Sequence, residues 1–287
     1  MAQSCFENKR YKMLKVKEGV YVPDVENTFP EDNPFYHRLK YDFIYDHVFD
    51  ENYPYIDNSF KARFARFFGR IRAFGVCFWV NPLVFGLRIK NREVLKKYKD
   101  ALKNGAVTVA NHAYRWDFLA VWQASGQSNL WFPGWGENFN TYERDNMRAA
   151  CGIPVPTSMS GLKKFNEAFD SLHEQKKWIH VFPEECRWDF YKPLRPFRKG
   201  AFTFSYKYKI PIVPMVITYR ERTGLYKLFN KNMPLFTITV GEPIFPNLDL
   251  PRKDSVDELR DRVHAKMVEM AGIVENPWPS VLPNDNG

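Results

Sequence analysis

Residues 107–117 read Val-Thr-Val-Ala-Asn-His-Ala-Tyr-Arg-Trp-Asp, and this short sequence sets the expected architecture. Its β-branched start predicts a strand, and the apolar run at 118–122 predicts a helix directly after it. His112 is therefore expected where the strand ends, and Asp117 where the helix begins. Side chains five apart on a regular helix point about 140° away from each other, so these two can meet only across a turn. A strand-to-helix junction supplies that turn, and sites in α/β sheets collect at such junctions.

The pair His112 and Asp117 has the residue types of a general base and its orienting carboxylate. A histidine held by an aspartate can take the proton from a hydroxyl group. The pair alone also fits an incidental surface histidine near a helix-capping aspartate, because the two residue types often fall this close by chance. Its meaning depends on the motifs that accompany it.

Four more motifs follow the pair in a fixed order. They are Trp-Ile-His-Val-Phe-Pro-Glu-Glu-Cys-Arg at 178–187, Pro-Phe-Arg-Lys-Gly-Ala-Phe at 196–202, Ile-Pro-Ile-Val-Pro-Met-Val at 210–216 and Val-Gly-Glu-Pro-Ile at 240–244. In this order and spacing the set resembles the glycerolipid acyltransferase family, which includes the 1-acylglycerol-3-phosphate acyltransferases. The resemblance covers roughly residues 90–244. It implies transfer of an acyl group from acyl-CoA or acyl carrier protein to a hydroxyl of a glycerolipid-type acceptor such as lysophosphatidate.

The resemblance also implies roles for single residues. His112 would be the general base, and Asp117 would hold its tautomer. Glu184 would bind the acceptor, with a loop carboxylate paired with Arg187 as the alternative. No metal and no bound cofactor are implied. The remaining candidates for substrate binding form two groups. The first group could hold a phosphate, or could instead form a solvated basic loop: Arg187, Arg198 and Lys199. The second group lies between the histidine and the aspartate: Tyr114 and Arg115.

Two departures from the family pattern concern the acceptor. The family's Phe-Pro-Glu-Gly reads Phe-Pro-Glu-Glu here, so Glu185 replaces a glycine and backbone freedom is lost. A second family motif ends in an arginine that contacts the acceptor's phosphate, and Thr157 stands in the corresponding place. Both departures bear on the identity of the acceptor more than on the type of reaction.

The charge of the chain favours anionic partners. The formal net charge is +9, and no helix-turn-helix, zinc-finger or RNA-recognition pattern accompanies it, so nucleic acid is not expected. The four cysteines have no ligand spacing and are interpreted as reduced thiols of a cytoplasmic protein. Nor do the histidines form a metal-ligand pair.

A basic amphipathic segment precedes the catalytic motifs. Aromatic residues recur at helical spacing from Phe60 to Phe74, and between Asn58 and Arg92 there are eight basic residues and no acidic one. This pattern is typical of a helix on an anionic membrane surface; the alternative is a core helix with a solvated basic face. The residues expected to face the membrane are Phe64, Arg66, Phe67 and Arg70.

Alternating strands and helices after residue 90 predict an α/β fold with a mixed, mostly parallel sheet flanked by helices. The expected strands are 106–111, 129–132, 178–182, 212–219 and 236–240. The expected helices are 116–124, 142–151, 161–175, 201–207 and 255–271, the last opened by a capping box at Ser255. The expected parts are an irregular extension at 1–57, the membrane-facing segment at 58–90, the acyltransferase domain at 91–275 and a loose tail at 276–287.

Two other functions compete with acyl transfer. One is a catalytically silent lipid-binding or scaffold protein on the same fold, which the departures at Glu185 and Thr157 favour. The other is an acyl thioester hydrolase, although the sequence lacks the nucleophile elbow of serine esterases. Without a signal-peptide or transmembrane pattern, we expect a cytoplasmic protein, peripheral on the inner face of the cell membrane. A carrier protein as acyl donor would be one more partner.

Overall fold

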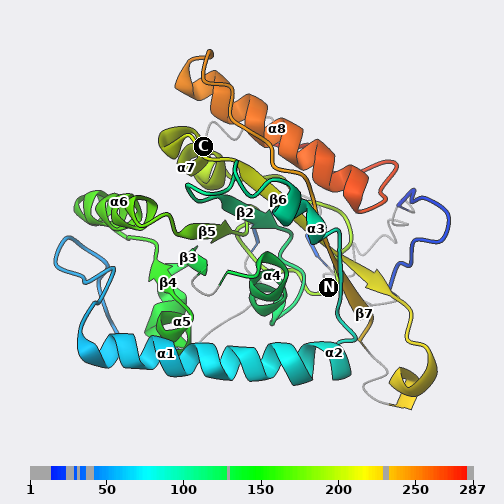
Figure 1. Ribbon diagram of the computed structural model, residues 1–287, viewed down its shortest axis with the longest axis horizontal. Coiled ribbons are helices and arrows are strands. Elements are labelled where there is room, and N and C mark those ends of the chain that lie inside the picture. Colours follow the sequence, from blue (N-terminus) through cyan, green and yellow to red (C-terminus); the bar gives the residue numbers. More distant parts are fainter. Residues whose placement is uncertain are drawn as a thin grey trace, which may run out of the picture.

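A seven-stranded sheet forms the centre of the computed structural model, in the order β1-β7-β6-β2-β5-β3-β4 (Figure 1). The structure describes residues 14–23, 29–30, 33–36, 42–127, 130–228 and 233–282. Residue 129, where one predicted strand begins, lies outside this range. The strands are β1 (Arg88–Lys90), β2 (Val107–Ala110), β3 (Leu130–Gly134), β4 (Gly152–Pro154), β5 (Trp178–Val181), β6 (Ile212–Arg220) and β7 (Leu235–Val240).

The five strands from β6 to β4 run parallel, and β7 pairs antiparallel with β6. Strand β1 pairs parallel with β7. The predicted fold class, a mixed and mostly parallel sheet flanked by helices, is confirmed. Because parallel strands share a direction, the carboxyl ends of β2, β5, β3 and β4 lie along one edge of the sheet, where sites of α/β proteins form.

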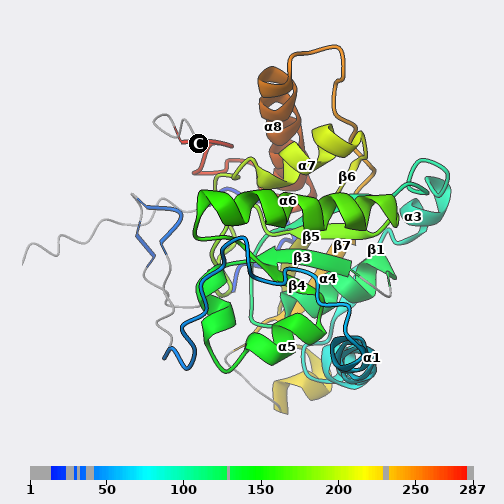
Figure 2. The ribbon, with the colours of Figure 1, turned by 90° about the vertical axis from the view of Figure 1, so that its left-hand side faces the viewer.

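Helices cover both faces of the sheet (Figure 2). Val107 and Val109 of β2 pack with Phe169 in the core on one face, whereas Ala110 packs with Val121 in the core on the other. This alternation is the two-residue period of a strand that is buried on both sides. Helices α6 (Met159–Glu174), α7 (Gly200–Tyr208) and α8 (Arg252–Met270) cover the first face; α3 (Glu93–Lys97), α4 (Asp117–Ser125) and α5 (Arg144–Ala149) lie toward the second.

Helix α8 corrects one detail of the prediction. It begins at Arg252 with Pro251 as its N-cap, three residues before the predicted capping box. Ser255 lies buried within the helix, and its hydroxyl has no hydrogen-bond partner. The capping-box prediction is wrong because Pro251, whose ring fixes φ, already starts the helix. Strand β4, with its glycine and proline, was not predicted; the edge position tolerates the proline.

Helix α1 (Phe60–Gly75) is present where the periodicity predicts it, and it has no buried residue. Its large apolar side chains are between 45 % and 84 % exposed, from Phe68 to Phe60. The helix contacts α5 through a small residue, because a Cβ added at Gly69 would lie 2.8 Å from the Ala149 Cβ. The alternative of a core helix is therefore wrong: the apolar side faces outward.

A π-helical turn, η1 (Val76–Val80), and α2 (Asn81–Leu83) continue α1 toward α4. The Cys77 thiol donates to the Leu119 carbonyl at 3.5 Å, and the Asn81 amide donates to the Gln123 side chain at 2.9 Å. The exposed segment is thereby attached to the helix that carries Asp117. Within the described residues, no helix combines the length and apolar character needed to cross a membrane.

Both terminal segments, where they are described, pack on parts of the chain that follow strands of the sheet. Phe29 stacks on Trp188 at 4.5 Å, and Val16 forms a bridge with Ile273. The prediction of a loose tail is wrong for residues 276–282, since the Asn276 side chain bonds the Leu194 backbone and the Trp278 indole donates to Tyr191 at 2.8 Å. Residues 1–13 and 283–287 lie outside the described part. The predicted boundaries at residues 57 and 90 stay predictions.

Candidate active site

His112 and Asp117 meet across the turn that joins β2 to α4. The His112 Nδ1 lies 2.6 Å from the Asp117 Oδ2. The same carboxylate oxygen accepts the backbone N–H of Ala113 at 2.9 Å and of Tyr114 at 3.3 Å. Asp117 is buried, so its negative charge is held by these donors and by the imidazole. The carboxylate closes the turn and orients the ring at the same time.

The imidazole of His112 is fixed from a second side. The Phe182 ring stacks on it at 4.1 Å with an interplanar angle of 13°. The His112 side chain is 23 % exposed, and its Nδ1 is engaged by Asp117. Nε2 is therefore the ring nitrogen that can meet a substrate from outside. In a neutral imidazole whose Nδ1 is protonated and donates to the aspartate, Nε2 has a lone pair that can accept a proton.

Glu184 lies under His112 and not at the surface. It is 2 % exposed, and its Oε2 accepts the backbone N–H of His112 at 3.0 Å. Its other oxygen accepts the Arg195 backbone N–H at 2.9 Å, and the Arg195 guanidinium bonds Oε2 at 3.1 Å. The alternative pairing of Glu184 with Arg187 is wrong, since Arg187 pairs with Asp189 at 2.9 Å. Glu184 thus holds the backbone at the point where the histidine leaves the strand.

Arg195 was not predicted as a site residue. It is fully buried, its guanidinium lies 4.4 Å from the centre of the Trp188 ring, and it bonds the Pro34 carbonyl at 2.7 Å. It also donates to the backbone carbonyl of Cys186. The residue stands between Leu194 and Pro196 in a stretch that reads as an exposed loop. The one available signal was a basic residue directly before the Pro-Phe-Arg-Lys-Gly-Ala-Phe motif at 196–202.

Glu185 has a backbone conformation that favours glycine. Its φ is +68°, in the left-handed region, which costs a residue with a Cβ about 1–2 kcal/mol. Its carboxylate pairs with Arg198 at 2.9 Å. The Arg198 guanidinium also lies 3.7 Å from the centre of the Phe35 ring. Glu185 therefore places a carboxylate next to Arg198, a candidate phosphate ligand.

The other predicted residues lie in different surroundings. Lys199 pairs with Asp257 of α8 at 3.3 Å, and Arg115 pairs with Glu143 at 2.7 Å on the exposed side of the turn. Tyr114 points into the core, where its ring stacks on Phe236 at 4.0 Å. Its expected role in substrate binding is wrong, because the turn rotates it away from the side that exposes His112.

The Thr157 position lies at the same edge of the sheet as His112. It follows β4, which is three strands from β2, so the two chain positions are separated by roughly 14 Å at the usual strand spacing. Thr157 is exposed and precedes the N-cap of α6, Ser158. The place of the missing arginine is thus at the rim of the site.

A second histidine, His180, is buried behind the first. Its Nδ1 lies 2.9 Å from the Thr108 hydroxyl, and its Nε2 has no partner. Burial, together with the charge of His112, lowers the pKa of His180 to about 3. His180 is therefore neutral at physiological pH and cannot assist as a cation. No cluster of three metal-ligating side chains occurs among the described residues.

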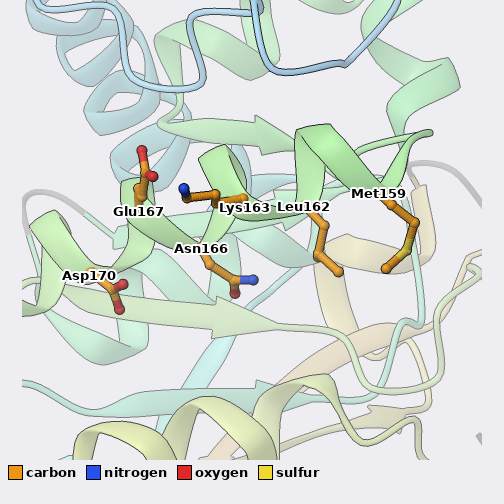
Figure 3. A pocket seen from close by; sticks show the side chains of 6 residues that line it. All are labelled: Met159, Leu162, Lys163, Asn166, Glu167 and Asp170. Atoms are coloured by element: carbon orange, nitrogen blue, oxygen red, sulfur yellow. The ribbon is translucent and has the colours of Figure 1, made fainter.

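An open groove lies elsewhere, on the outer face of α6 (Figure 3). Its lining consists of surface side chains of that one helix, among them Met159, Lys163 and Asp170. None of these belongs to the cluster around His112, and the groove does not contribute to the site.

The fold and site define an α/β protein with a histidine–aspartate pair at a strand end. Residues 86–218 match the sequence model of the Acyltransferase family.

A 1-acyl-sn-glycerol-3-phosphate acyltransferase of Saccharomyces cerevisiae is 30 % identical over 107 residues, which are 36 % of this chain and 34 % of the relative. An uncharacterized acyltransferase of Schizosaccharomyces pombe is 28 % identical over 183 residues, 56 % of this chain and 57 % of the relative. The chain thus matches between a third and three fifths of the length of these relatives.

A solved structure is also similar, the 1-acyl-sn-glycerophosphate acyltransferase PlsC of Thermotoga maritima. It shares 16 % identity with a TM-score of 0.49, over 77 % of this chain and 86 % of that one. The family match over residues 86–218 and the sequence relatives together support an acyltransferase domain in this chain. This agrees with the predicted family.

Proposed function

We propose that this protein transfers an acyl group from acyl-CoA or acyl carrier protein to a hydroxyl of a glycerolipid-type acceptor. The observation that carries the proposal is the 2.6 Å contact between His112 Nδ1 and Asp117 at a strand end, with the imidazole partly exposed. The family match supports acyl transfer as the type of reaction. The reaction needs no metal and no bound cofactor.

The mechanism follows from the two ring nitrogens. Nε2 of His112 takes the proton of the acceptor hydroxyl as its oxygen attacks the thioester carbonyl. Asp117 keeps Nδ1 protonated and stabilises the imidazolium that forms. The proton then passes to the leaving thiolate, so the products are the acylated acceptor and the free thiol. Attack is direct, without a covalent acyl-enzyme.

Glu184 acts through His112 in this proposal. Because it is buried and bonded to the His112 N–H and to Arg195, it positions the histidine and does not touch the acceptor. Arg198, with Glu185 beside it, remains a candidate for an anionic headgroup at the exposed side. A carboxylate on this arginine weakens its attraction for a simple phosphate monoester, which favours an acceptor with another headgroup.

The exposed face of α1 supports a membrane partner. Outward phenylalanines beside Lys61 and Arg63, both exposed, suit an anionic lipid surface. Arg66 and Arg70 are less exposed, and Arg66 bonds the Asp57 carbonyl at 2.7 Å and lies 5.7 Å from the Trp131 ring centre. Arg66 thus faces the body, in contrast to its expected place, and the attachment to lipid rests on the phenylalanines and the outer cations.

Thiol release separates acyl transfer from its competitors. The protein is incubated with a long-chain acyl-CoA and a panel of acceptors, and free thiol and lipid products are followed. Release that depends on an acceptor supports the proposal. Release without an acceptor would identify a hydrolase, and no release with any pair would favour a silent lipid-binding protein. Asp117→Asn serves as the matched control for thiol release by background hydrolysis of the thioester.

A further inference from the structure

A second apolar surface lies next to α1 and comes from a distant part of the chain. The connection between β6 and β7 contains the short helix η3 (Gly224–Leu228), the yellow coil at the lower right of Figure 1. Leu225 is 76 % exposed and Leu228 is 71 % exposed. Within the described residues these are among the most exposed large apolar side chains. We call residues 224–228 the hairpin tip.

The hairpin tip is fixed to the end of the α1 segment. The Tyr226 hydroxyl donates to the Pro82 carbonyl at 2.6 Å, and Arg222 donates to the carbonyls of Tyr226 at 3.2 Å and Val84 at 3.4 Å. A Cβ at Gly86 would lie 3.3 Å from the Tyr226 ring. The tip is therefore attached by the polar parts of its residues, while its two leucines remain outside.

The tip and α1 lie at the same end of the molecule. Figures 1 and 2 both place α1, α2 and the hairpin tip at the lower end, with α8 at the opposite end. Between them the exposed apolar side chains continue through Phe78, Trp79 and Leu83, each about 60 % exposed. A continuous outward apolar surface of this extent marks an interaction site.

The charges beside this surface favour one kind of partner. Lys61, Arg63 and Arg72 of α1 are exposed, and Lys227 lies between the two leucines of the tip. Helix α1 contains no acidic side chain, and in the described part of the connection, residues 221–228, Glu221 at its start is the one acidic residue. Cations around exposed leucine and aromatic side chains complement an anionic lipid surface, where apolar groups enter and the cations meet the headgroups.

We propose that the hairpin tip is a second membrane anchor, which inserts Leu225 and Leu228 into an anionic bilayer beside α1. The inference rests on the membrane attachment proposed for α1. Two anchors from distant parts of the chain restrict the rotation of the molecule about the α1 axis more tightly than α1 would alone. They would hold the His112 site at one orientation toward the lipid.

Vesicle binding tests the anchor. The full chain is floated with vesicles of phosphatidylcholine and phosphatidylglycerol at 3:1, and Leu225→Ser/Leu228→Ser is compared with Leu248→Ser/Val274→Ser, which makes two exposed apolar residues polar elsewhere. We expect about tenfold weaker binding for the tip variant, persisting at high salt because the lost contact is apolar, and no change for the control. Equal binding of tip variant, control and wild type would overturn the anchor.

A spectroscopic probe gives an independent readout. Leu225→Cys and, as control, Met159→Cys on α6 are labelled with an environment-sensitive dye in a Cys5→Ser background, since the other three cysteines are buried. The dye at 225 should shift to the blue on vesicles and the dye at 159 should not. Unshifted emission at 225 with normal vesicle binding overturns the anchor alone. A wild type that transfers acyl groups but never binds vesicles overturns both anchors and leaves the proposed reaction standing.

Discussion

The turn around His112 and the surface of α1 are built in opposite ways. At the turn, the buried charges of Asp117, Glu184 and Arg195 each have several hydrogen-bond partners. At α1, the large apolar side chains are exposed, and the helix packs closely on α5 at Gly69. A catalytic group needs one fixed geometry, whereas a surface that meets lipid must keep its apolar groups outside. The same chain therefore buries charge in one region and exposes phenylalanine in the other.

The largest effect should come from removing the base at the fixed turn. General-base assistance contributes about 10²- to 10⁴-fold in rate, so His112→Ala should lose at least that much acyl transfer. Asp117→Asn should be nearly as severe, and the double variant should add little because the pair acts as a unit. Acyl transfer is measured by thiol release with the best acceptor. A folded His112→Ala protein that retains near-normal transfer would end the proposal.

The buried pair beneath the histidine should be the next most sensitive part. Arg195→Met leaves the Glu184 carboxylate buried without its cation, which typically costs about 3–5 kcal/mol of unfolding free energy. The matched control is Arg198→Met, which breaks an exposed pair worth about 1 kcal/mol or less. Denaturant titration measures both.

If Glu184 and Arg195 position His112, a variant that replaces both residues should separate stability from activity. Glu184→Gln/Arg195→Met should recover part of the stability, because no uncompensated charge remains, while transfer stays low since the His112 N–H has lost its carboxylate partner. Equal losses in Arg195→Met and Arg198→Met would show that the turn is no more tightly held than the surface.

Acid should lower the free energy of unfolding through the buried histidines. Because the pKa of His180 is lowered to about 3 by burial, only the unfolded chain takes up this proton between pH 6.5 and that value. Stability should fall with falling pH across this window by about 1.4 kcal/mol per pH unit for this group. Burial lowers the pKa of His173 and His264 as well, which adds to the slope.

Denaturation at several pH values isolates the share of His180. His180→Gln should reduce the slope by one proton relative to the wild type. An identical slope in His180→Gln would mean that water reaches the buried ring.

The smallest effect should appear at the outward cations of α1. Each basic residue near an anionic surface contributes on the order of 1 kcal/mol to the free energy of membrane binding. Lys61→Glu/Arg63→Glu should therefore weaken vesicle binding, and the binding that remains should depend more on apolar contacts. Arg252→Glu/Lys253→Glu, at the start of α8 on the opposite end, carries the same charge change as a control. If both variants bind equally, or salt has no effect on the wild type, the charges of α1 do not face lipid.

The sequence predicted the parts of the site that depend on local spacing. His112 and Asp117 are five residues apart, so a strand followed by a helix was enough to bring them together. Arg195 could not be predicted, since its partners, Glu184, Cys186 and Pro34, come together only when distant segments pack. Tyr114 was misplaced because the rotation of the turn, which sends it toward Phe236, depends on the three bonds to Asp117.

The orientation of the apolar side of α1 could not be predicted from the sequence, for a different reason. Helical spacing reveals that a helix has an apolar side, but the same pattern serves a core and a lipid surface. What turns the phenylalanines outward is a contact of small residues, Gly69 against Ala149, and this contact contributes little to apolar periodicity. The pairing of Arg66 with Asp57 is likewise a tertiary contact that the helix pattern does not contain.

The Gly69 contact also has an evolutionary consequence. An added methyl group at this position would meet both the Cβ and the carbonyl oxygen of Ala149 at 2.8 Å, so each larger residue would push α1 from the body. The phenylalanines around it can exchange for other large apolar residues without such a penalty. We expect the lineage of this protein to vary freely along the outer side of α1 and to keep glycine at position 69, because any larger side chain there would push α1 away from α5.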